Sequence, residues 1–174
     1  MGEASIGEAI NRAREYLRQR PDEARYTDTP ATASVEHGLR CRVIGPNGAV
    51  LFSDMPAGVG GGGSAPSPGW LLRAAHAACD ATLIAMRAAE ENIELSRLEV
   101  VVDSESDDRG LLGMDDATPA GPIHTRVRIA LEAEGVPEAK LQDLVEWARR
   151  HSPVDDALLR PVPVSVEVAA RKPS

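Results

Sequence analysis

The feature that most constrains the fold is a long helical segment that has no polar face. Ser67 is suited to cap this helix and Pro68 to begin it, because the first residue of a helix needs no N–H donor. From there to about Glu91, apolar residues occupy nearly every side of the predicted helix. They are Trp70, Leu71, Leu72, Ala74, Ala75, Ala77, Ala78, Ala81, Leu83, Ile84 and Met86. A helix that is apolar all round is buried by other elements, so we expect the domain to be built around it.

A single cysteine, Cys79, lies in the middle of this helix, and a run of four glycines at 60–63 precedes the helix. The packing of the helix would shelter such a thiol from solvent, and the flexible glycine loop would let a small molecule reach it. The thiolate is the reactive form, and nearby cations favour it. Because Cys79 lies about three turns into the helix, the helix dipole is too far away to help. His76, one turn earlier on the same face, or an arginine would supply the charge. The alternative is that Cys79 is a small buried hydrophobe and His76 a packing residue.

The composition argues against several classes of partner. A net charge of −8 opposes binding to phosphate backbones, and only 3% of residues are aromatic, so we expect no nucleic acid partner. The longest apolar run is interrupted by Arg73, His76, Asp80 and Arg87, so we expect no membrane span. Two cysteines and an N-terminus without a secretory signal indicate a reducing cytoplasm.

The sequence lacks the spacing of a cofactor site. A phosphate-binding loop would need Lys and then Ser or Thr after the glycines, but residues 64–66 are Ser-Ala-Pro. The aspartates of 103–116 fit no EF-hand register, and His124 and His151 are isolated. We therefore expect neither a cofactor nor a metal ion.

Hydrophobic periodicity predicts the remaining elements. Helices are expected over residues 5–19 and 137–151, with a further helical turn at 155–159. In the second of these helices the spacing predicts that Leu141, Leu144, Val145 and Ala148 face inward. Strands are expected over residues 32–44, 49–53, 98–103, 123–131 and 162–168. Residues 123–131 alternate between apolar and polar side chains, which predicts a strand with one face exposed to water. A hairpin turn is expected at 45–48 and a polar excursion over 104–120. Helices packed on one face of a mainly antiparallel sheet define an α+β domain.

Several blocks of the chain, taken in order, resemble one known family. They are Asp54-Met55-Pro56 with Gly61-Gly62, Pro66-Ser67-Pro68 with Leu71-Leu72, Ala75-His76-Ala77-Ala78-Cys79, Ile93-Glu94-Leu95, and His151-Ser152-Pro153-Val154. Over residues 34–168 this pattern resembles the OsmC/Ohr family of osmotically inducible and organic-hydroperoxide-resistance proteins.

The resemblance implies an OsmC-like α+β fold with two long central helices. It also implies an intertwined homodimer with its active sites at the subunit interface. The implied activity is reduction of organic hydroperoxides by a cysteine on the first central helix, here Cys79. In the family a second cysteine on the other helix resolves the sulfenic acid, and an Arg and a Glu orient the thiolate and the substrate. We assign residues 31–174 to this domain and residues 1–30 to an N-terminal helical extension.

The chain departs from the family pattern at the site. Ser152 stands where the resolving cysteine belongs, and Gly69 stands where the family has Glu. Arg40 and Arg42 on the first expected strand are candidates for the arginine by location. Ser152 either donates a hydrogen bond to the sulfur or caps the helical turn that follows it. Cys41 is either a replacement resolving cysteine, which requires its Cα within about 7 Å of its partner's, or a strand residue facing the core.

Two hypotheses of different class follow. In the first, Cys79 is the catalytic residue of a one-cysteine thiol peroxidase that reduces a small organic hydroperoxide and is restored by an external thiol reductant. In the second, the protein is a non-catalytic dimer that binds a small apolar molecule under Trp70 and Met86, or that has a purely structural role.

Overall fold

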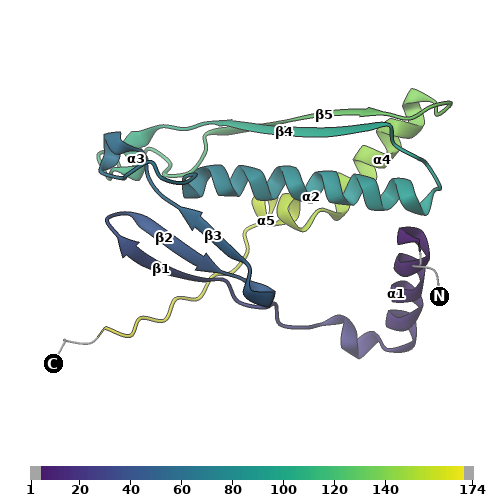
Figure 1. The fold of residues 1–174 in the computed structure, drawn as a ribbon, viewed down its shortest axis with the longest axis horizontal. Coiled ribbons are helices and arrows are strands. Elements are labelled where there is room, and N and C mark those ends of the chain that lie inside the picture. Colours follow the sequence, from purple (N-terminus) through teal and green to yellow (C-terminus); the bar gives the residue numbers. More distant parts are fainter. Residues whose placement is uncertain (1–4, 171–174) are drawn as a thin grey trace.

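The chain forms an α+β domain arranged around one long helix, α2, which covers Pro68–Glu90 (Figure 1). A two-stranded sheet lies along one side of α2, and a separate three-stranded sheet lies near its N-terminal half. The computed structural model describes residues 5–170. The first four residues, which belong to the expected extension 1–30, and the last four lie outside the described residues.

The three-stranded sheet has the order β1-β2-β3 and is antiparallel throughout. Its strands are β1 (Thr32–His37), β2 (Arg40–Ile44) and β3 (Val50–Ser53). The prediction of one strand over 32–44 was wrong, because the chain reverses at Gly38. The φ of Gly38 is 54°, a left-handed conformation that glycine adopts easily. The turn expected at 45–48 joins β2 to β3, with Asn47 and Gly48 at positive φ.

The two-stranded sheet pairs β4 (Arg97–Glu105) with β5 (His124–Glu132) in antiparallel register. The connection between them contains a short helix, α3 (Asp108–Leu111). Val127 and Ile129 are half-buried, whereas Arg126 and Arg128 on the other face are exposed and both pair with Asp103. The prediction that this strand has one wet face is confirmed.

In the single chain α2 is buried along one stripe and not on every side. The residues of this stripe are four apart: His76, Asp80, Ile84 and Ala88. Trp70 and Leu72, near the start of the helix, are exposed. The expectation of burial all round is therefore wrong for one chain, because the elements packed on α2 leave part of its surface open. Across residues 5–170, every helix falls short of the length or the apolar character that a membrane crossing requires.

The second central helix, α4 (Glu138–His151), packs antiparallel to the C-terminal half of α2. Leu144 and Ala148 are its buried residues, as the periodicity predicted. A single residue, Ser152, separates α4 from the short helix α5 (Pro153–Leu159). This sharp junction brings the start of α5 beside the middle of α2.

The first helix, α1 (Ile6–Gln19), packs against the C-terminal end of α2. Ser5 caps it through a reciprocal pair of hydrogen bonds with Glu8. Gly7 is the close contact, since a Cβ there would lie 3.0 Å from the Ala89 carbonyl oxygen.

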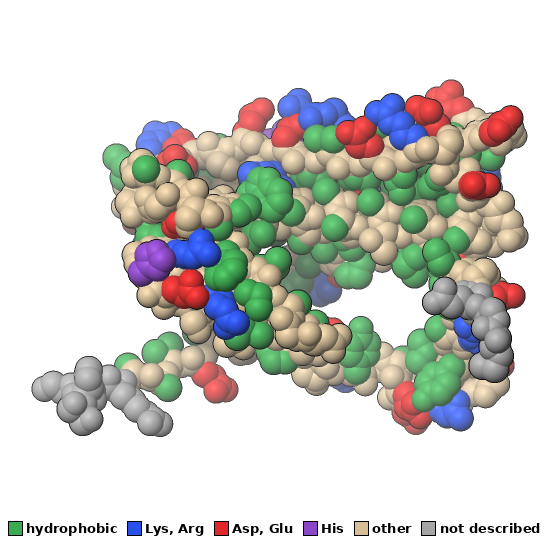
Figure 2. Space-filling model, in the orientation of Figure 1, with side chains coloured by type: hydrophobic (Ala, Val, Ile, Leu, Met, Phe, Trp, Pro, Cys, Tyr) green, Lys and Arg blue, Asp and Glu red, His purple; other side chains and the backbone are tan. Residues whose placement is uncertain are grey.

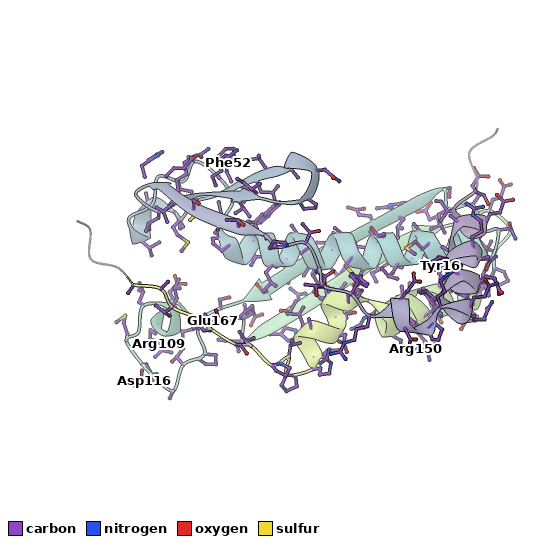
Figure 3. All side chains as sticks on the ribbon, turned by 90° about the horizontal axis from the view of Figure 1, so that it is seen from below. Tyr16, Phe52, Arg109, Asp116, Arg150 and Glu167 are labelled. Carbon is purple, nitrogen blue, oxygen red and sulfur yellow. The ribbon has the colours of Figure 1, made fainter. Side chains whose placement is uncertain are left out.

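The last expected strand, 162–168, is not formed in the described part of this chain, so that prediction was wrong. The segment runs extended and exposed, and Val164, Val166 and Val168 are 82%, 78% and 83% exposed. Figure 3 shows Glu167 of this segment well away from Phe52 of the three-stranded sheet. A strand needs a neighbour for its backbone N–H and C=O groups, and this segment has none among residues 5–170.

Candidate functional site

Cys79 lies on α2 with its thiol facing the start of α5. The Ser152 hydroxyl donates a hydrogen bond to the Cys79 sulfur, with 3.2 Å between Oγ and Sγ. Cys79 is half-buried and is not in a disulfide. A donor directed at the sulfur stabilises the thiolate, which is the nucleophilic form.

Ser152 is held in this position because it caps α5. Its Oγ accepts a hydrogen bond from the Asp155 backbone N–H at 3.2 Å, and Pro153 follows as the first residue of the helix. The hydroxyl oxygen therefore accepts from the backbone while its proton points to the sulfur. The two roles that the sequence left as alternatives for Ser152, helix cap and thiol partner, occur together.

His76 lies one turn before Cys79 on α2, and its ring contacts two carboxylates. The distance from Nε2 is 2.8 Å to Asp155 Oδ1 and 3.6 Å to Asp80 Oδ2. All three side chains are buried. The structure thus places His76 in a buried carboxylate cluster beside the Cys79–Ser152 pair.

Asp80 is the member of this cluster with the fewest partners. It is 0% exposed, and neither of its carboxyl oxygens has a hydrogen-bond partner among the described residues. Burial, and after it the charge of Asp155, raises the pKa of Asp80 above that of an ordinary aspartate, while Ser152 first, and then His76 and Arg149, oppose the rise. Burying a carboxyl group without partners costs free energy, so Asp80 lowers the stability of the fold.

A cavity of about 450 Å³ opens beside the cluster. It is lined by Arg73 and His76 of α2, by Arg149 and Asp155, and by residues from the β5 region. The Arg149 Nε atom lies 3.5 Å from Asp155 Oδ2. Cys79, one helical turn from His76, is not among the residues that line this cavity.

The other candidates from the sequence, Arg40, Arg42 and Cys41, lie on β2. Arg40 donates a hydrogen bond to the Ser64 hydroxyl at 2.7 Å. Cys41 is not in a disulfide. Among the described residues no hydrogen bond joins any of the three to Cys79.

The glycine loop is organised by Asp54. Its carboxylate accepts hydrogen bonds from the backbone and hydroxyl of Ser64 and from the backbone of Met55 and Gly62. These donors, Ser64 foremost, lower the pKa of Asp54 to about 2. At Gly61 a Cβ would lie 1.8 Å from the Met55 carbonyl oxygen, so only glycine fits. The loop thereby fixes the start of α2.

Comparison with known proteins agrees with this architecture. The sequence model of the family described as OsmC-like protein matches residues 61–167. The chain therefore belongs to the OsmC-like family, and its α+β fold with two central helices is the fold of that family. None of the curated proteins matches the chain.

Solved structures of the same fold come from several bacteria. An organic hydroperoxide resistance protein OsmC from Legionella pneumophila is 25% identical, with a TM-score of 0.55 over 76% of this chain and 89% of that one. An organic hydroperoxide resistance protein from Elizabethkingia anophelis is 21% identical, with a TM-score of 0.56 and the same coverages of 76% and 89%. An OsmC-like protein of unknown function from Vibrio cholerae is 9% identical, with a TM-score of 0.63 over 76% and 94%.

Sequence reasoning missed Asp155 and gave Asp80 no role. Asp155 is 79 residues from His76, and no local spacing joins the two. The available signal was the capping pattern, because an aspartate three residues after a capping serine lies in the first turn of the helix.

Proposed function

We propose that this OsmC-like protein is a one-cysteine thiol peroxidase that reduces organic hydroperoxides at Cys79. The observation that carries the proposal is the Ser152 hydroxyl at 3.2 Å from the Cys79 sulfur, where the family resemblance has the second cysteine. The similar proteins from Legionella and Elizabethkingia are named for organic hydroperoxide resistance, which supports the substrate class.

In the first step the Cys79 thiolate attacks the distal oxygen of the hydroperoxide. An S–O bond forms as the O–O bond breaks, the sulfur is oxidised to a sulfenic acid, and the leaving alkoxide takes a proton to become an alcohol. One external thiol then attacks the sulfenic sulfur, which releases water and leaves a mixed disulfide. A second external thiol releases that disulfide and restores Cys79.

Ser152 sets the type of cycle. A hydroxyl can donate to the thiolate and to the sulfenic acid that follows, but it cannot form a disulfide. Because Cys41 has no contact with Cys79 among the described residues, we assign the reducing role to an external thiol. Abundant small thiols are a property of a reducing cytoplasm, which is where we place the protein.

We further propose that the protein works as a homodimer. In the single chain Trp70 and Phe52 are exposed, and Figure 2 shows an opening framed by the three-stranded sheet, α1 and α2. The extended segment 162–168 presents alternate valines to solvent and lacks a strand neighbour. A second copy would cover this apolar surface and pair with this segment. To Arg40 or Arg42 of that copy we assign the positive charge beside Cys79.

The dimer is tested by the molar mass in solution. Light scattering after size-exclusion chromatography should give twice the mass of one chain. A mass equal to one chain at micromolar concentration contradicts the dimer and leaves Cys79 without a cation from a second copy.

The peroxidase is tested with the two cysteines as a matched pair. Purified wild type, Cys79→Ser and Cys41→Ser are given cumene hydroperoxide and dithiothreitol, and consumption of the peroxide is followed. Wild type and Cys41→Ser should consume it at equal rates, and Cys79→Ser should fall to the rate without protein. Equal rates in all three would contradict the proposal.

We also assign residues 1–30 to an extension outside the family domain of 31–174. The extension has its own packing site, since Gly7 lies against Ala89 and Arg14 pairs with Glu90. Deleting residues 1–30 should lower the melting temperature while leaving Cys79 chemistry in place. Loss of all folded protein on deletion would contradict the assignment.

A further inference from the structure

The strongest unassigned feature of the molecule is the buried cluster of His76, Asp80 and Asp155. His76 and Asp80 are one turn apart on α2, and Asp155 comes from the first turn of α5. One ligand-type atom from each residue lies within 4.8 Å of the other two. The exposed fractions of the three residues are 4%, 0% and 3%. Carboxylates are rarely buried at this density without a counter-charge.

The hydrogen bonds within the cluster account for Asp155 but not for Asp80. Asp155 is satisfied, because it contacts His76 through Oδ1 and faces Arg149 through Oδ2. Asp80 directs Oδ2 toward His76 Nε2 at 3.6 Å, and this distance is too long for a hydrogen bond. Neither oxygen of Asp80 has a partner among the described residues. A fully buried carboxylate without a hydrogen-bond partner requires an explanation, and a bound ion is one that fits a cluster of ligand atoms.

We propose that His76 Nε2 and one carboxylate oxygen each from Asp80 and Asp155 bind a divalent transition-metal ion. Imidazole nitrogen with carboxylate oxygen is a donor set for Zn²⁺ and its neighbours in the first transition row, with metal–ligand distances of about 2.0–2.2 Å. The two carboxylates match the charge of one divalent ion, and Arg149, half exposed at the edge of the cluster, adds one positive charge. The ion would take the place between His76 Nε2 and Asp155 Oδ1 that the hydrogen bond now occupies.

The surroundings suit such a site. Arg149 contacts the second oxygen of Asp155, which leaves Oδ1 directed at the cluster; outer contacts of this kind orient ligating carboxylates. His76 and Asp155 also line the cavity of about 450 Å³, so an ion can reach the site and keep an open position there. Three protein ligands and one open position are the arrangement of reactive zinc sites.

The site is separate from the proposed thiol chemistry. Cys79 is not among the clustered ligand atoms, and its sulfur contacts Ser152. Cobalt(II) can report on this separation, because a thiolate ligand adds an intense near-ultraviolet band that nitrogen and oxygen ligands do not.

The test uses the full chain without an affinity tag, treated with a chelator, dialysed and titrated with Zn²⁺ alone by calorimetry. Wild type should bind one ion per chain with a dissociation constant of micromolar or below. Asp80→Asn keeps the shape of the side chain and should weaken binding at least tenfold. Asp156→Asn, on the exposed side of the same short helix, and Cys79→Ser should bind as wild type does.

Each other outcome overturns the proposal. Absence of saturable Zn²⁺ binding to wild type would mean that the cluster is held together by hydrogen bonds and ion pairs without a metal ion. Retained affinity in Asp80→Asn, or lost affinity in Cys79→Ser together with a thiolate band from cobalt(II), would place the ion elsewhere. Should Asp80→Asn not fold, as judged by circular dichroism, His76→Gln replaces it with the same expected loss. The melting temperature of wild type should also rise when Zn²⁺ is added, and an unchanged value contradicts binding.

Discussion

The two halves of the buried stripe on α2 differ in chemistry although they share one spacing. In the C-terminal half, Ile84 and Ala88 are buried with Leu144 and Ala148 of α4, and all four side chains are apolar. In the N-terminal half, the residues of the same stripe are His76 and Asp80, and their neighbours at the start of α5 are polar.

The apolar half of the stripe therefore stabilises the fold, whereas the polar half carries the groups that can take part in chemistry. Burial of the apolar half removes hydrocarbon from water and stabilises the fold. Burial of the polar half leaves the Asp80 carboxyl group without hydrogen-bond partners, and this destabilises the fold. A buried polar group that lowers stability is a candidate for a functional role. Cys79, between His76 and Asp80 in sequence, belongs to the polar half, and we therefore locate the chemistry there.

The largest effect on stability is expected in the apolar half. Ile84 is 0% exposed, and Ile84→Ala should lower the free energy of unfolding by about 3 kcal/mol, since it removes buried methyl groups and leaves a cavity. Urea denaturation at one fixed protein concentration measures the change. A loss below about 1 kcal/mol would show that this half does not carry the core.

The next effect concerns reactivity in the polar half. Ser152→Ala removes the donor to the sulfur and should slow alkylation of Cys79 by iodoacetamide at pH 7 about tenfold, because a hydrogen bond to a charged group contributes about 1.5 kcal/mol. Ser152→Thr keeps the hydroxyl and should react as wild type does. Cys41 in the same samples is the internal reference. Equal alkylation rates in Ser152→Ala and Ser152→Thr would show that the Ser152 hydroxyl does not affect the reactivity of Cys79.

The smallest effect is a dependence on pH. The pKa of Asp80 is raised in the folded state, so its contribution to stability is fully present below the pKa of an unfolded aspartate and is lost as the pH rises through the folded value. Asp80→Asn does not titrate. With a chelator present, its stability relative to wild type should therefore increase between pH 4 and pH 8, by about 1 kcal/mol. A difference that is constant over this range contradicts the burial of an unpartnered carboxyl.

Features that depend on local sequence could be predicted, whereas those that depend on distant neighbours could not. The start of α2 at Ser67 and Pro68 and the buried residues Leu144 and Ala148 follow from local rules of capping and periodicity, and those predictions were confirmed. The turn at Gly38 was missed because the flanking residues alternate as one strand would.

The parts that depend on distant neighbours could not be predicted. The segment 162–168 has the alternation of a strand, but strand formation depends on a partner that this chain does not provide among residues 5–170. The contact between His76 and Asp155 depends on how α5 docks on α2, and no spacing encodes that. The resemblance indicated that Ser152 stands where the family has its second cysteine. It could not predict the hydrogen bond from the Ser152 hydroxyl to the Cys79 sulfur, because that bond depends on how α5 packs on α2.

The most direct test of the central claim compares the two cysteines within one molecule. Wild-type protein is treated with a stoichiometric amount of cumene hydroperoxide in the presence of dimedone, which traps sulfenic acids, and its peptides are analysed by mass spectrometry. The account predicts the dimedone adduct on the Cys79 peptide and an unmodified Cys41 peptide. An adduct on Cys41 alone, or equal labelling of both cysteines, would contradict it.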